Sequence, residues 1–460
     1  MSTLSPARLA AYRIVLEVEK NEAYAHETLN RVFRNIKLDD RDKAFATRLA
    51  YGVIAYKGVL EAMIQRFSNK PQSTKIEVSC ALQIALYEIF YEGQKEFAAV
   101  NQGVELVKKV APFARGFANA ILRRAVREKD AFPWGDPAKQ SDALSRVVGL
   151  PQWLLDTLIK QYGMTAATDI ADALNEPSEL FAAVPEWVGS LDETKARFKK
   201  EDVVAHAYAP ELPAALVFDE PAQALQSPLI SNRHVLIMDA AAQLTVKLAS
   251  AQPAQRILEI GAGRGNKSLL LASTARALGT PLEVIHAVDI HAFKSDLLEK
   301  EARRLSLSEI KPVTADATKL DAMKEQLSSD EGSYDAVLID APCTGVGTLR
   351  RHVDKRWRLK PNDSKQLAKV NAQLLWTNAH FVKPGGKLIY ATCTILTEEN
   401  EAVLEGFLKS EIGAQFSIET IAATDVPKQW EKFIQPEGTF QSIPEIGGPD
   451  GHFIAVMKRR

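Results

Sequence analysis

Two cysteines follow two hydrophobic runs in the C-terminal half of this 460-residue chain. Cys343 comes shortly after the run 334–339 and Asp340, and Cys393 comes after the run 387–391. A cysteine thiolate is a strong nucleophile. If both runs are neighbouring strands of one parallel sheet, the two thiols and Asp340 meet at its carboxyl edge. Most buried cysteines are small hydrophobic residues without a chemical role, and that alternative remains open.

A glycine-rich loop lies between the hydrophobic run 256–260 and a helical pattern that starts near residue 268. Its glycines allow a sharp turn and a close approach of the backbone to a ligand, and helix N-terminal N–H groups can hold a carboxylate. The candidate cofactor-binding residues in this loop are Gly261, Ala262, Gly263, Arg264, Gly265, Asn266 and Lys267. The alternative is a tight strand-to-helix turn that binds nothing.

Two aspartates follow the next two predicted strands. Asp289 ends the second strand, at a distance from the glycine loop that suits an acceptor for ribose hydroxyls. Asp316 follows the third strand and can accept from an adenine amino group or a backbone amide. Either aspartate can instead cap the next helix. With the glycine loop they outline an adenosine pocket, which a nicotinamide cofactor would also fit.

A basic segment, residues 350–360, lies between the two cysteines, and six of its eleven residues are Lys or Arg. Cations can neutralise phosphates while an aromatic ring stacks on a base. The candidate RNA-binding residues are Arg350, Arg351, His352, Arg356 and Trp357. A charge run is as often a solvated face, but the position beside a cysteine loop favours a nucleic acid as partner.

The elements that must position these residues follow from periodicity. Residues 7–128 show helical spacing, and a Pro- and Gly-containing linker follows at 133–137. A short helix is predicted over 149–163, and short β-like runs over 178–235 predict a small α+β domain. After Asp239, strand and helix patterns alternate, which predicts a doubly wound parallel sheet.

Composition narrows the class of protein. The formal net charge is −1, which excludes a globally basic nucleic-acid coat. Three cysteines are too few for a disulfide framework, and we interpret Cys80, in the helical region, as a core residue. The spacing of Cys and His predicts no metal site. No apolar run is long enough for a membrane span and no signal-peptide core is present, so we expect a cytoplasmic protein without a membrane partner.

Several motifs together resemble one family, the RsmB/Sun-type RNA cytosine-C5 methyltransferases. In the C-terminal half they are Asp340-Ala341-Pro342-Cys343-Thr344-Gly345-Val346-Gly347, the segment from Arg351-His352 to Trp357, Lys383-Pro384-Gly385-Gly386, Tyr390-Ala391-Thr392-Cys393-Thr394 and Glu399-Asn400-Glu401. In the N-terminal region Arg41-Asp42, Tyr51-Gly52-Val53, Asn101 and Phe117-Ala118-Asn119-Ala120-Ile121-Leu122-Arg123-Arg124 resemble a NusB-like domain. The resemblance covers nearly the whole chain.

The resemblance implies a multidomain fold. Residues 1–132 would form an all-α, NusB-like helical RNA-binding domain, and residues 145–235 a small α+β, RRM-like linker domain. Residues 236–460 would form the α/β doubly wound, Rossmann-like methyltransferase domain. We expect a monomer.

The resemblance also implies a reaction. The cofactor would be S-adenosyl-L-methionine and the substrate a cytosine in RNA, in this branch 16S rRNA. Cys393 would add to C6 of the base as nucleophile, Asp340 would contact the cytosine edge, and Cys343 would assist release. Lys267 is placed with these catalytic residues, while the loop 261–267, Asp289, Asp316 and Asp340 would hold the cofactor.

The chain departs from the family pattern in places. The glycine loop usually reads Cys-Ala-Ala-Pro-Gly-Gly-Lys, whereas here Gly-Ala-Gly-Arg-Gly-Asn-Lys occupies 261–267. Two alternatives therefore stay open: a catalytically weakened RNA-binding or ribosome-assembly protein of the same fold, and a methyltransferase that acts on transfer RNA.

Overall fold

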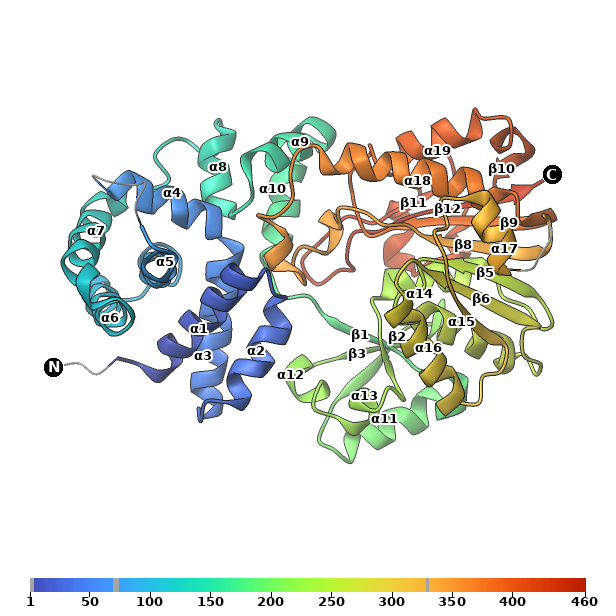
Figure 1. Cartoon of the computed structure of the whole chain (residues 1–460), viewed down its shortest axis with the longest axis horizontal. Coiled ribbons are helices and arrows are strands. Elements are labelled where there is room, and N and C mark those ends of the chain that lie inside the picture. The colour runs from blue at the N-terminus through green and yellow to red at the C-terminus, as the bar shows by residue number, and fades with distance from the viewer. Residues whose placement is uncertain (1–3, 69–73, 328–330) are drawn as a thin grey trace. The chain divides into compact units, whose positions relative to one another are not determined.

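The computed structural model describes residues 4–68, 74–327 and 331–460, which form two compact units (Figure 1). The helical unit consists of Met1–Glu176 together with Leu349–Pro361. The second unit, here called the sheet unit, consists of Pro177–Thr348 and Asn362–Arg460. This division differs from the sequence-based boundary near residue 132, because the helices over 141–173 pack with the N-terminal helices and a segment from the C-terminal half joins them.

The helical unit is built from α1 to α10. Their bounds are α1 Pro6–Asn21, α2 Ala25–Arg34, α3 Asp40–Ala55, α4 Lys57–Phe67, α5 Ile76–Phe90, α6 Glu96–Val110, α7 Arg115–Glu128, α8 Ser141–Val148, α9 Gln152–Tyr162 and α10 Met164–Ala173. The helix predicted over 149–163 is α9, which begins after Pro151 and ends at Gly163. Short 3-10 turns η2 Pro112–Ala114, η3 Lys129–Ala131 and η6 Val353–Lys355 complete the unit.

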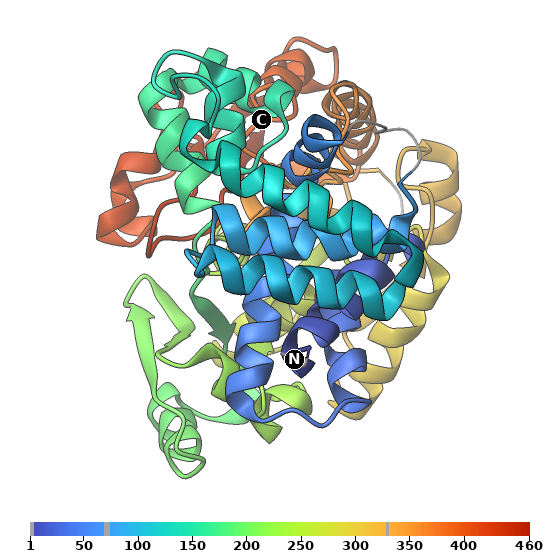
Figure 2. The same cartoon turned by 90° about the vertical axis from the view of Figure 1, so that its left-hand side faces the viewer.

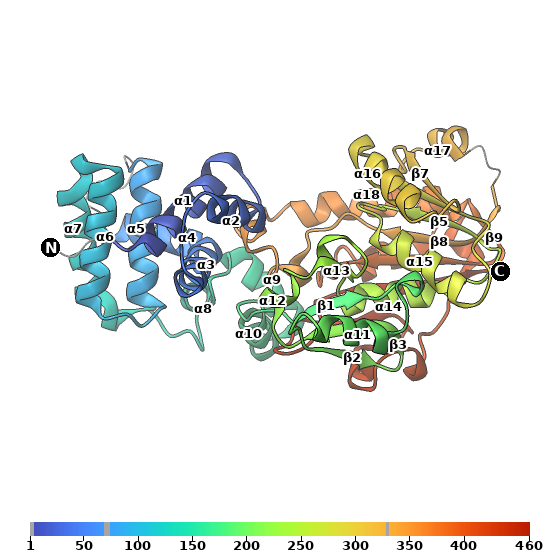
Figure 3. The same cartoon turned by 90° about the horizontal axis from the view of Figure 1, so that it is seen from below.

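Helix α5 is the central helix of this unit. Most of its residues are buried, Figure 3 shows α6 beside it, followed by α7, and Figure 2 shows these helices running side by side. Cys80 on α5 is buried among the other hydrophobic side chains of the helical core, as interpreted from the sequence. The carboxylate of Glu88, also fully buried on α5, accepts hydrogen bonds from the Arg8 guanidinium at 2.5–3.1 Å, so its charge is paired inside the core.

The sheet unit begins with a small antiparallel sheet in the order β2-β3-β1-β4. Its strands are β1 Leu180–Ala183, β2 Ala205–Ala209, β3 Leu212–Phe218 and β4 Leu236–Ile237, with α11 Leu191–Lys199, α12 Pro221–Ala224, α13 Pro228–Ser231 and the turn η4 Glu186–Val188 between them. Three of these strands coincide with the predicted β-like runs. The sequence analysis did not predict β2, because this edge strand has no buried side chain and therefore no hydrophobic pattern.

The large sheet has the order β10-β12-β9-β8-β5-β6-β7, and β11 pairs with β12. Its strands are β5 Arg256–Ile260, β6 Val284–Asp289, β7 Ile310–Thr314, β8 Tyr334–Asp340, β9 Val382–Thr392, β10 Phe416–Ile418, β11 Phe440–Gln441 and β12 Phe453–Arg459. Strands β5 to β9 are parallel, which confirms the doubly wound prediction. Strands β10 to β12 are antiparallel additions that the prediction did not include.

Helices cover both faces of the large sheet. They are α14 Ala240–Ala249, α15 Asn266–Ala277, α16 Ala292–Arg304, α17 Leu320–Leu327, α18 Asp363–Ala379 and α19 Glu401–Leu408. Alternate strand residues face opposite ways, so Ile257 packs with α14, α15 and α16 while Leu258 packs with α17, α18 and α19. Figure 1 shows α18 and α19 on the opposite side of the sheet from α14 to α16.

The remaining described turns of this unit are η5 Val346–Thr348, η7 Gly413–Gln415, η8 Ala423–Asp425 and η9 Lys428–Phe433. Among the described residues, no helix combines the length and apolar character that crossing a bilayer requires.

Candidate active site

The two cysteine loops meet at the carboxyl edge of the large sheet. Strands β8 and β9 are parallel neighbours, with Asp340 opposite Ala391. The Sγ atoms of Cys343 and Cys393 lie 3.3 Å apart, and the Cys393 backbone N–H points at the Cys343 sulfur, also at 3.3 Å. This separation exceeds the roughly 2.05 Å of a disulfide, so the two sulfurs are not bonded to each other. The prediction that the cysteines share one edge is confirmed.

The Cys343 thiol is held in its protonated form. The hydrogen bond with Cys393 and burial both raise the pKa of the Cys343 thiol well above its ordinary value. Cys343 therefore remains protonated at neutral pH.

Lys267 and Asp340 form an ion pair beside the thiols. Lys267 lies in the first turn of α15, and its Nζ is 2.5 Å from Oδ2 of Asp340, at the end of β8. Burial disfavours the Lys267 ammonium, but the attraction of Asp340 outweighs it, and the pKa of Lys267 lies above its ordinary value. Glu259 and Cys393 add to that attraction. A permanent cation therefore lies close to the Cys393 sulfur.

Glu259 is a buried acid beneath this ion pair that sequence reasoning did not identify as a site residue. It lies on β5 and is 1% exposed, and its carboxyl accepts a hydrogen bond from the Ser268 hydroxyl. Burial raises the pKa of Glu259 to about 7, against the opposing effects of Ser268 and Lys267. A signal was present, since an acidic residue inside an otherwise apolar strand run is unusual.

A second buried acid, Glu399, joins the two cysteine loops. Its carboxylate accepts hydrogen bonds from the Thr344 backbone N–H at 2.8 Å and from the Thr344 hydroxyl at 2.6 Å. The Thr394 hydroxyl lies 2.9 Å from that of Thr344. Because Thr344 follows Cys343 and Thr394 follows Cys393, Glu399 fixes the residues next to both thiols. It belongs to the motif Glu399-Asn400-Glu401, but the sequence analysis assigned it no role.

Asn400 and Tyr390 hold the second cysteine loop from the other side. The Asn400 amide donates to the Thr394 carbonyl at 3.0 Å, and its oxygen accepts from the Thr392 hydroxyl at 2.7 Å. The Tyr390 hydroxyl donates to the backbone carbonyl of Glu399 at 2.5 Å. All the groups in this network are buried, where an unpaired polar atom is costly, so the loop has one well-defined conformation.

The buried acids make stability depend on pH. Burial raises the pKa of Glu399 from 4.5 to about 7. The folded protein thus binds this proton more tightly than the unfolded chain does, so this contribution to stability decreases as pH rises from about 4.5 to about 7. In the wild type this carboxyl lowers the free energy of unfolding by roughly 3 kcal/mol over that pH range, and we expect Glu399→Gln to abolish that change. Urea denaturation at pH 5 and pH 8 measures it.

Exposed Glu431→Gln is the control for this measurement and should retain the full pH dependence. Glu259 also lowers the free energy of unfolding as pH rises, so the Glu399 variant should still show the pH dependence that Glu259 causes. Equal pH dependence in wild type and Glu399→Gln would contradict the assignment.

The glycine loop lies against the end of β8. Gly261 has φ +80°, and a Cβ there would be 2.3 Å from the backbone oxygen of Asp340, so only glycine allows this approach. A Cβ at Gly263 would have only one neighbour, the Gly261 carbonyl oxygen at 3.8 Å, so space beside it is open. Asp289 accepts from the Gly263 N–H at 3.1 Å and from Lys294 at 3.1 Å. The loop is therefore tied to β6.

The other predicted cofactor residues have local partners. Asp316 accepts from the Thr318 N–H and hydroxyl, and the hydroxyl bond holds the pKa of Asp316 below its usual range. These bonds close a turn at residues 316–318, ahead of α17, which begins at Leu320, so Asp316 does not cap that helix. The Asn266 amide donates to the Ile237 carbonyl, and Arg233 donates to Asn266 and to the Arg264 carbonyl. These two loop residues therefore connect the glycine loop to the small sheet.

The basic segment is folded into the helical unit. The Arg356 side chain is fully buried and donates to the carbonyls of Gly149 and Leu174 and to Oδ1 of Asn175. The Trp357 indole N–H donates to the Ala55 carbonyl at 2.7 Å. A guanidinium buried among these acceptors cannot reach a phosphate, which corrects the interpretation of Arg356 as an RNA contact. Arg350 is buried as well, whereas Arg351 and His352 are half-buried.

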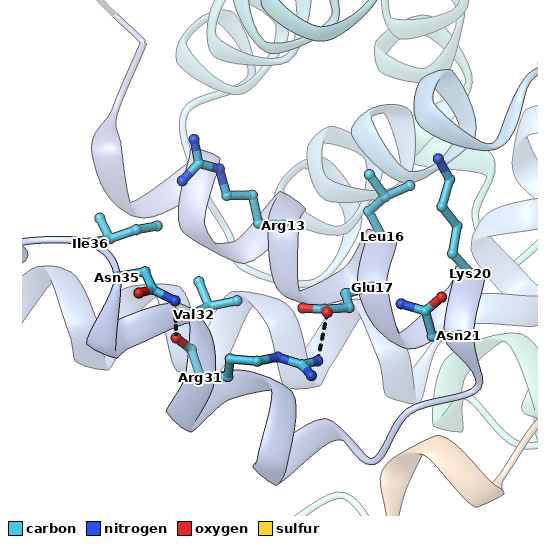
Figure 4. Close-up of a pocket in the computed structure, with 9 residues that line it drawn as sticks. All are labelled: Arg13, Leu16, Glu17, Lys20, Asn21, Arg31, Val32, Asn35 and Ile36. Carbon is cyan, nitrogen blue, oxygen red and sulfur yellow. Dashed lines mark hydrogen bonds and ion pairs between the residues drawn. The ribbon is translucent and has the colours of Figure 1, made fainter.

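A separate pocket of about 420 Å³ lies within the helical unit between α1 and α2. Figure 4 shows its lining residues, which are Arg13, Leu16, Glu17, Lys20, Asn21, Arg31, Val32, Asn35 and Ile36. Cationic and amide groups surround an apolar floor, and Arg31 pairs with Glu17 at 2.6 Å. These residues form no motif, so sequence reasoning did not find them. Within 4–68, 74–327 and 331–460, no cluster of His, Cys, Asp or Glu is arranged to hold a metal ion.

Comparison with known proteins identifies the family. Residues 246–458 match the family model described as 16S rRNA methyltransferase RsmB/F, and residues 5–127 match the NusB family. The ribosomal RNA small subunit methyltransferase B of Thermus thermophilus is 30% identical, over 98% of this chain and 97% of that protein. The chain belongs to the RsmB/F family.

Other relatives agree with membership of the RsmB/F family. The probable ribosomal RNA small subunit methyltransferase B of Bacillus subtilis is 28% identical over 98% of both chains. The crystal structure of PH0851 superposes over the full length of both chains with a TM-score of 0.81 at 19% identity, a likeness that shows the fold alone. The expected fold class, a NusB-like helical domain followed by a small domain and a Rossmann-like methyltransferase domain, is confirmed.

Proposed function

We propose that this RsmB/F-family protein transfers a methyl group from S-adenosylmethionine to C5 of a cytosine in 16S rRNA through a covalent adduct with Cys393. The observation that carries this proposal is the meeting of two thiols, 3.3 Å apart, with the Lys267–Asp340 ion pair at one sheet edge. Family membership and the names of the relatives support RNA methylation, and the paired cysteines support the C5 chemistry.

The residues at the carboxyl ends of β5 and β6 fit a nucleoside cofactor. The space beside Gly263 is open, and the N-terminus of α15 directs backbone N–H groups toward it. Asp289 has about four lone-pair positions, of which Gly263, His291 and Lys294 occupy three, which leaves one for a ribose hydroxyl. When bound, S-adenosylmethionine supplies an electrophilic methyl group on a positively charged sulfur.

Cys393 is the nucleophile in this proposal. A neighbouring cation favours a thiolate, and Lys267 is such a cation. The thiolate forms a bond from Sγ to C6 of cytosine, and the electron pair of the C5–C6 double bond moves to C5. C5 then accepts the methyl group. Loss of the C5 proton to a base returns electrons to the ring, and the S–C6 bond breaks with its electron pair returning to sulfur.

Asp340 and Cys343 act on the same base. Asp340 contacts the polar edge of the cytosine and stabilises the adduct, while Lys267 keeps its carboxylate oriented. Cys343 assists release of Cys393, for which its close contact and its protonated state at neutral pH are suited. Glu399 keeps both thiols in reach of one base through Thr344 and Thr394.

RNA binding is assigned to both units. In the helical unit the pocket between α1 and α2 presents Arg13, a cation that can neutralise a phosphate, whereas Lys20 and Arg31 already pair with Glu77 and Glu17. Arg351 and His352 remain candidate RNA contacts beside the cysteine loop. Arg356 no longer belongs to this group because of its burial.

The test is transfer of labelled methyl groups to small-subunit rRNA that lacks its cytosine methylations. We expect label in 5-methylcytidine at one site. Label in transfer RNA but not rRNA would move the substrate to the transfer RNA alternative. If neither RNA is labelled and calorimetry detects no S-adenosylmethionine binding, the protein is an RNA-binding member of the fold, and the proposed reaction is wrong.

A further inference from the structure

The basic segment found from sequence has an unexpected place in the fold. The chain leaves the sheet unit at Thr348, five residues after Cys343, and returns at Asn362. Between them Leu349–Pro361, here called the strap, folds as part of the helical unit. The family model for the methyltransferase includes the strap within its range, 246–458, so its sequence assigns it to one domain and its packing to another.

Buried contacts hold the strap along its length. Arg356 donates to Gly149 and Leu174 carbonyls, at the C-terminal ends of α8 and α10, where a cation also meets the negative end of each helix dipole. A Cβ at Gly58 would be 2.2 Å from the Trp357 ring, so α4 needs a glycine there to admit the indole. Arg358 donates to the Ala23 carbonyl after α1 at 3.0 Å.

The arrangement of these contacts does not suit a surface that binds nucleic acid. Val353 belongs to the hydrophobic core of the helical unit, and Trp357 packs against the same core. Burial lowers the pKa of Arg356 to about 10, so the guanidinium stays charged at neutral pH, and its partners are carbonyl and amide oxygens. Burying a charge costs desolvation free energy, and the hydrogen bonds of the Arg356 guanidinium must offset that cost.

Both ends of the strap lead to the groups that fix the thiols. On one side Thr344, whose N–H and hydroxyl both donate to Glu399, is separated from the strap by four residues. On the other side α18 begins at Asp363, and buried Ser364 in its first turn acts to lower the pKa of Glu399, which burial raises overall. Whatever holds the strap therefore restrains the segment that carries Thr344 and the start of α18.

We propose that the helical unit positions the Cys343 loop for catalysis by anchoring the strap, with Arg356 as the positioning residue. The inference rests on the proposed function for its catalytic readout. A displacement of about 1 Å at a reacting group can cost on the order of a hundredfold in rate, so a loosened strap should slow the step that needs Cys343. It should also expose that thiol.

The test compares Arg356→Met with Lys355→Met, which removes the same charge from the neighbouring, half-buried position. The first readout is the rate at which iodoacetamide alkylates Cys343, followed by mass spectrometry on folded protein without RNA. We expect alkylation to be faster by roughly threefold or more in Arg356→Met, because local opening of the anchored loop exposes the thiol. Lys355→Met should match wild type.

The second readout is the covalent protein–RNA adduct during turnover with S-adenosylmethionine. Arg356→Met should lower kcat with an unchanged KM for S-adenosylmethionine, and it should accumulate adduct as Cys343→Ala does. A merely destabilised protein would lose activity without accumulating adduct. Trp357→Phe, which removes the hydrogen bond to Ala55 and keeps a ring over Gly58, gives the milder change if Arg356→Met does not fold.

Wild-type alkylation of Cys343 in the Arg356 and Trp357 variants would overturn the positioning role. An equal increase of the KM for RNA in Arg356→Met and Lys355→Met, with no adduct, would also overturn it and make the segment an RNA contact. Alkylation could be faster in Arg356→Met while no variant, Cys343→Ala included, forms an adduct. That result would support anchoring of the strap and contradict the proposed covalent chemistry.

Discussion

Replacing Cys393 with alanine should abolish methyl transfer, with a loss in kcat of at least about ten-thousand-fold, as for other enzymes that lose their nucleophile. The reason is geometric as well as chemical. Cys393 follows the end of β9, close to the Lys267 ammonium, whereas the thiol 3.3 Å away is held in its protonated form. The measurement is single-turnover methyl transfer to unmethylated rRNA, with a denaturing gel for the adduct.

The matched control is Cys80→Ala, which removes a buried thiol from the helical core and should leave the chemical step unchanged. S-adenosylmethionine binding to Cys393→Ala should remain near the wild-type value, because the proposed cofactor loop follows β5 and Asp289 ends β6, whereas Cys393 follows β9. Activity that survives in folded Cys393→Ala would transfer the role of nucleophile to Cys343.

The second large effect is expected from Cys343→Ala. Addition of Cys393 to the base and methyl transfer should still occur, while release slows, so a covalent protein–RNA adduct should accumulate. Loss of a proton-transfer group slows the step that it assists by on the order of a hundredfold or more. Adduct is measured by gel mobility in denaturant, with the labelled methyl group showing whether transfer preceded arrest.

Removing the Cys343 sulfur also frees the Cys393 N–H and thiol from their 3.3 Å contacts. Cys343→Ser is therefore the companion variant, because it keeps a hydrogen-bonding group at that position and should trap less adduct than alanine. The double variant Cys343→Ala, Cys393→Ala should form no adduct. Adduct in the double variant would mean that a group other than Cys393 attacks the base.

The altered glycine loop shows how a departure in sequence can leave geometry intact. Gly261 and Gly265 both adopt positive φ, and Lys267 reaches Asp340 from the first helical turn. Arg264 and Asn266, which differ from the usual family loop, contact Arg233 and β4. The weakened-protein alternative thus gains no support from the backbone of this loop, and cofactor binding is the measurement that decides it.

Local pattern alone determined much of this protein. Alternating strand and helix periodicity predicted β5 to β9 as parallel strands, and the position of Cys343 and Cys393 after two of them predicted one shared edge. These conclusions depend on side-chain spacing within a run and on the rule that parallel strands end together. Both are properties of short stretches of sequence, and so they can be read without knowing distant contacts.

Only the tertiary structure decided the surroundings of those residues. Glu259 and Glu399 became significant because burial raises their pKa values, and burial is set by other segments of the chain. Arg356 was read as a surface cation, yet its acceptors lie 181 to 207 positions away, and the Trp357 acceptor lies 302 positions away. A charge run has the same local pattern whether water or distant carbonyls solvate it, so only the fold could distinguish the two.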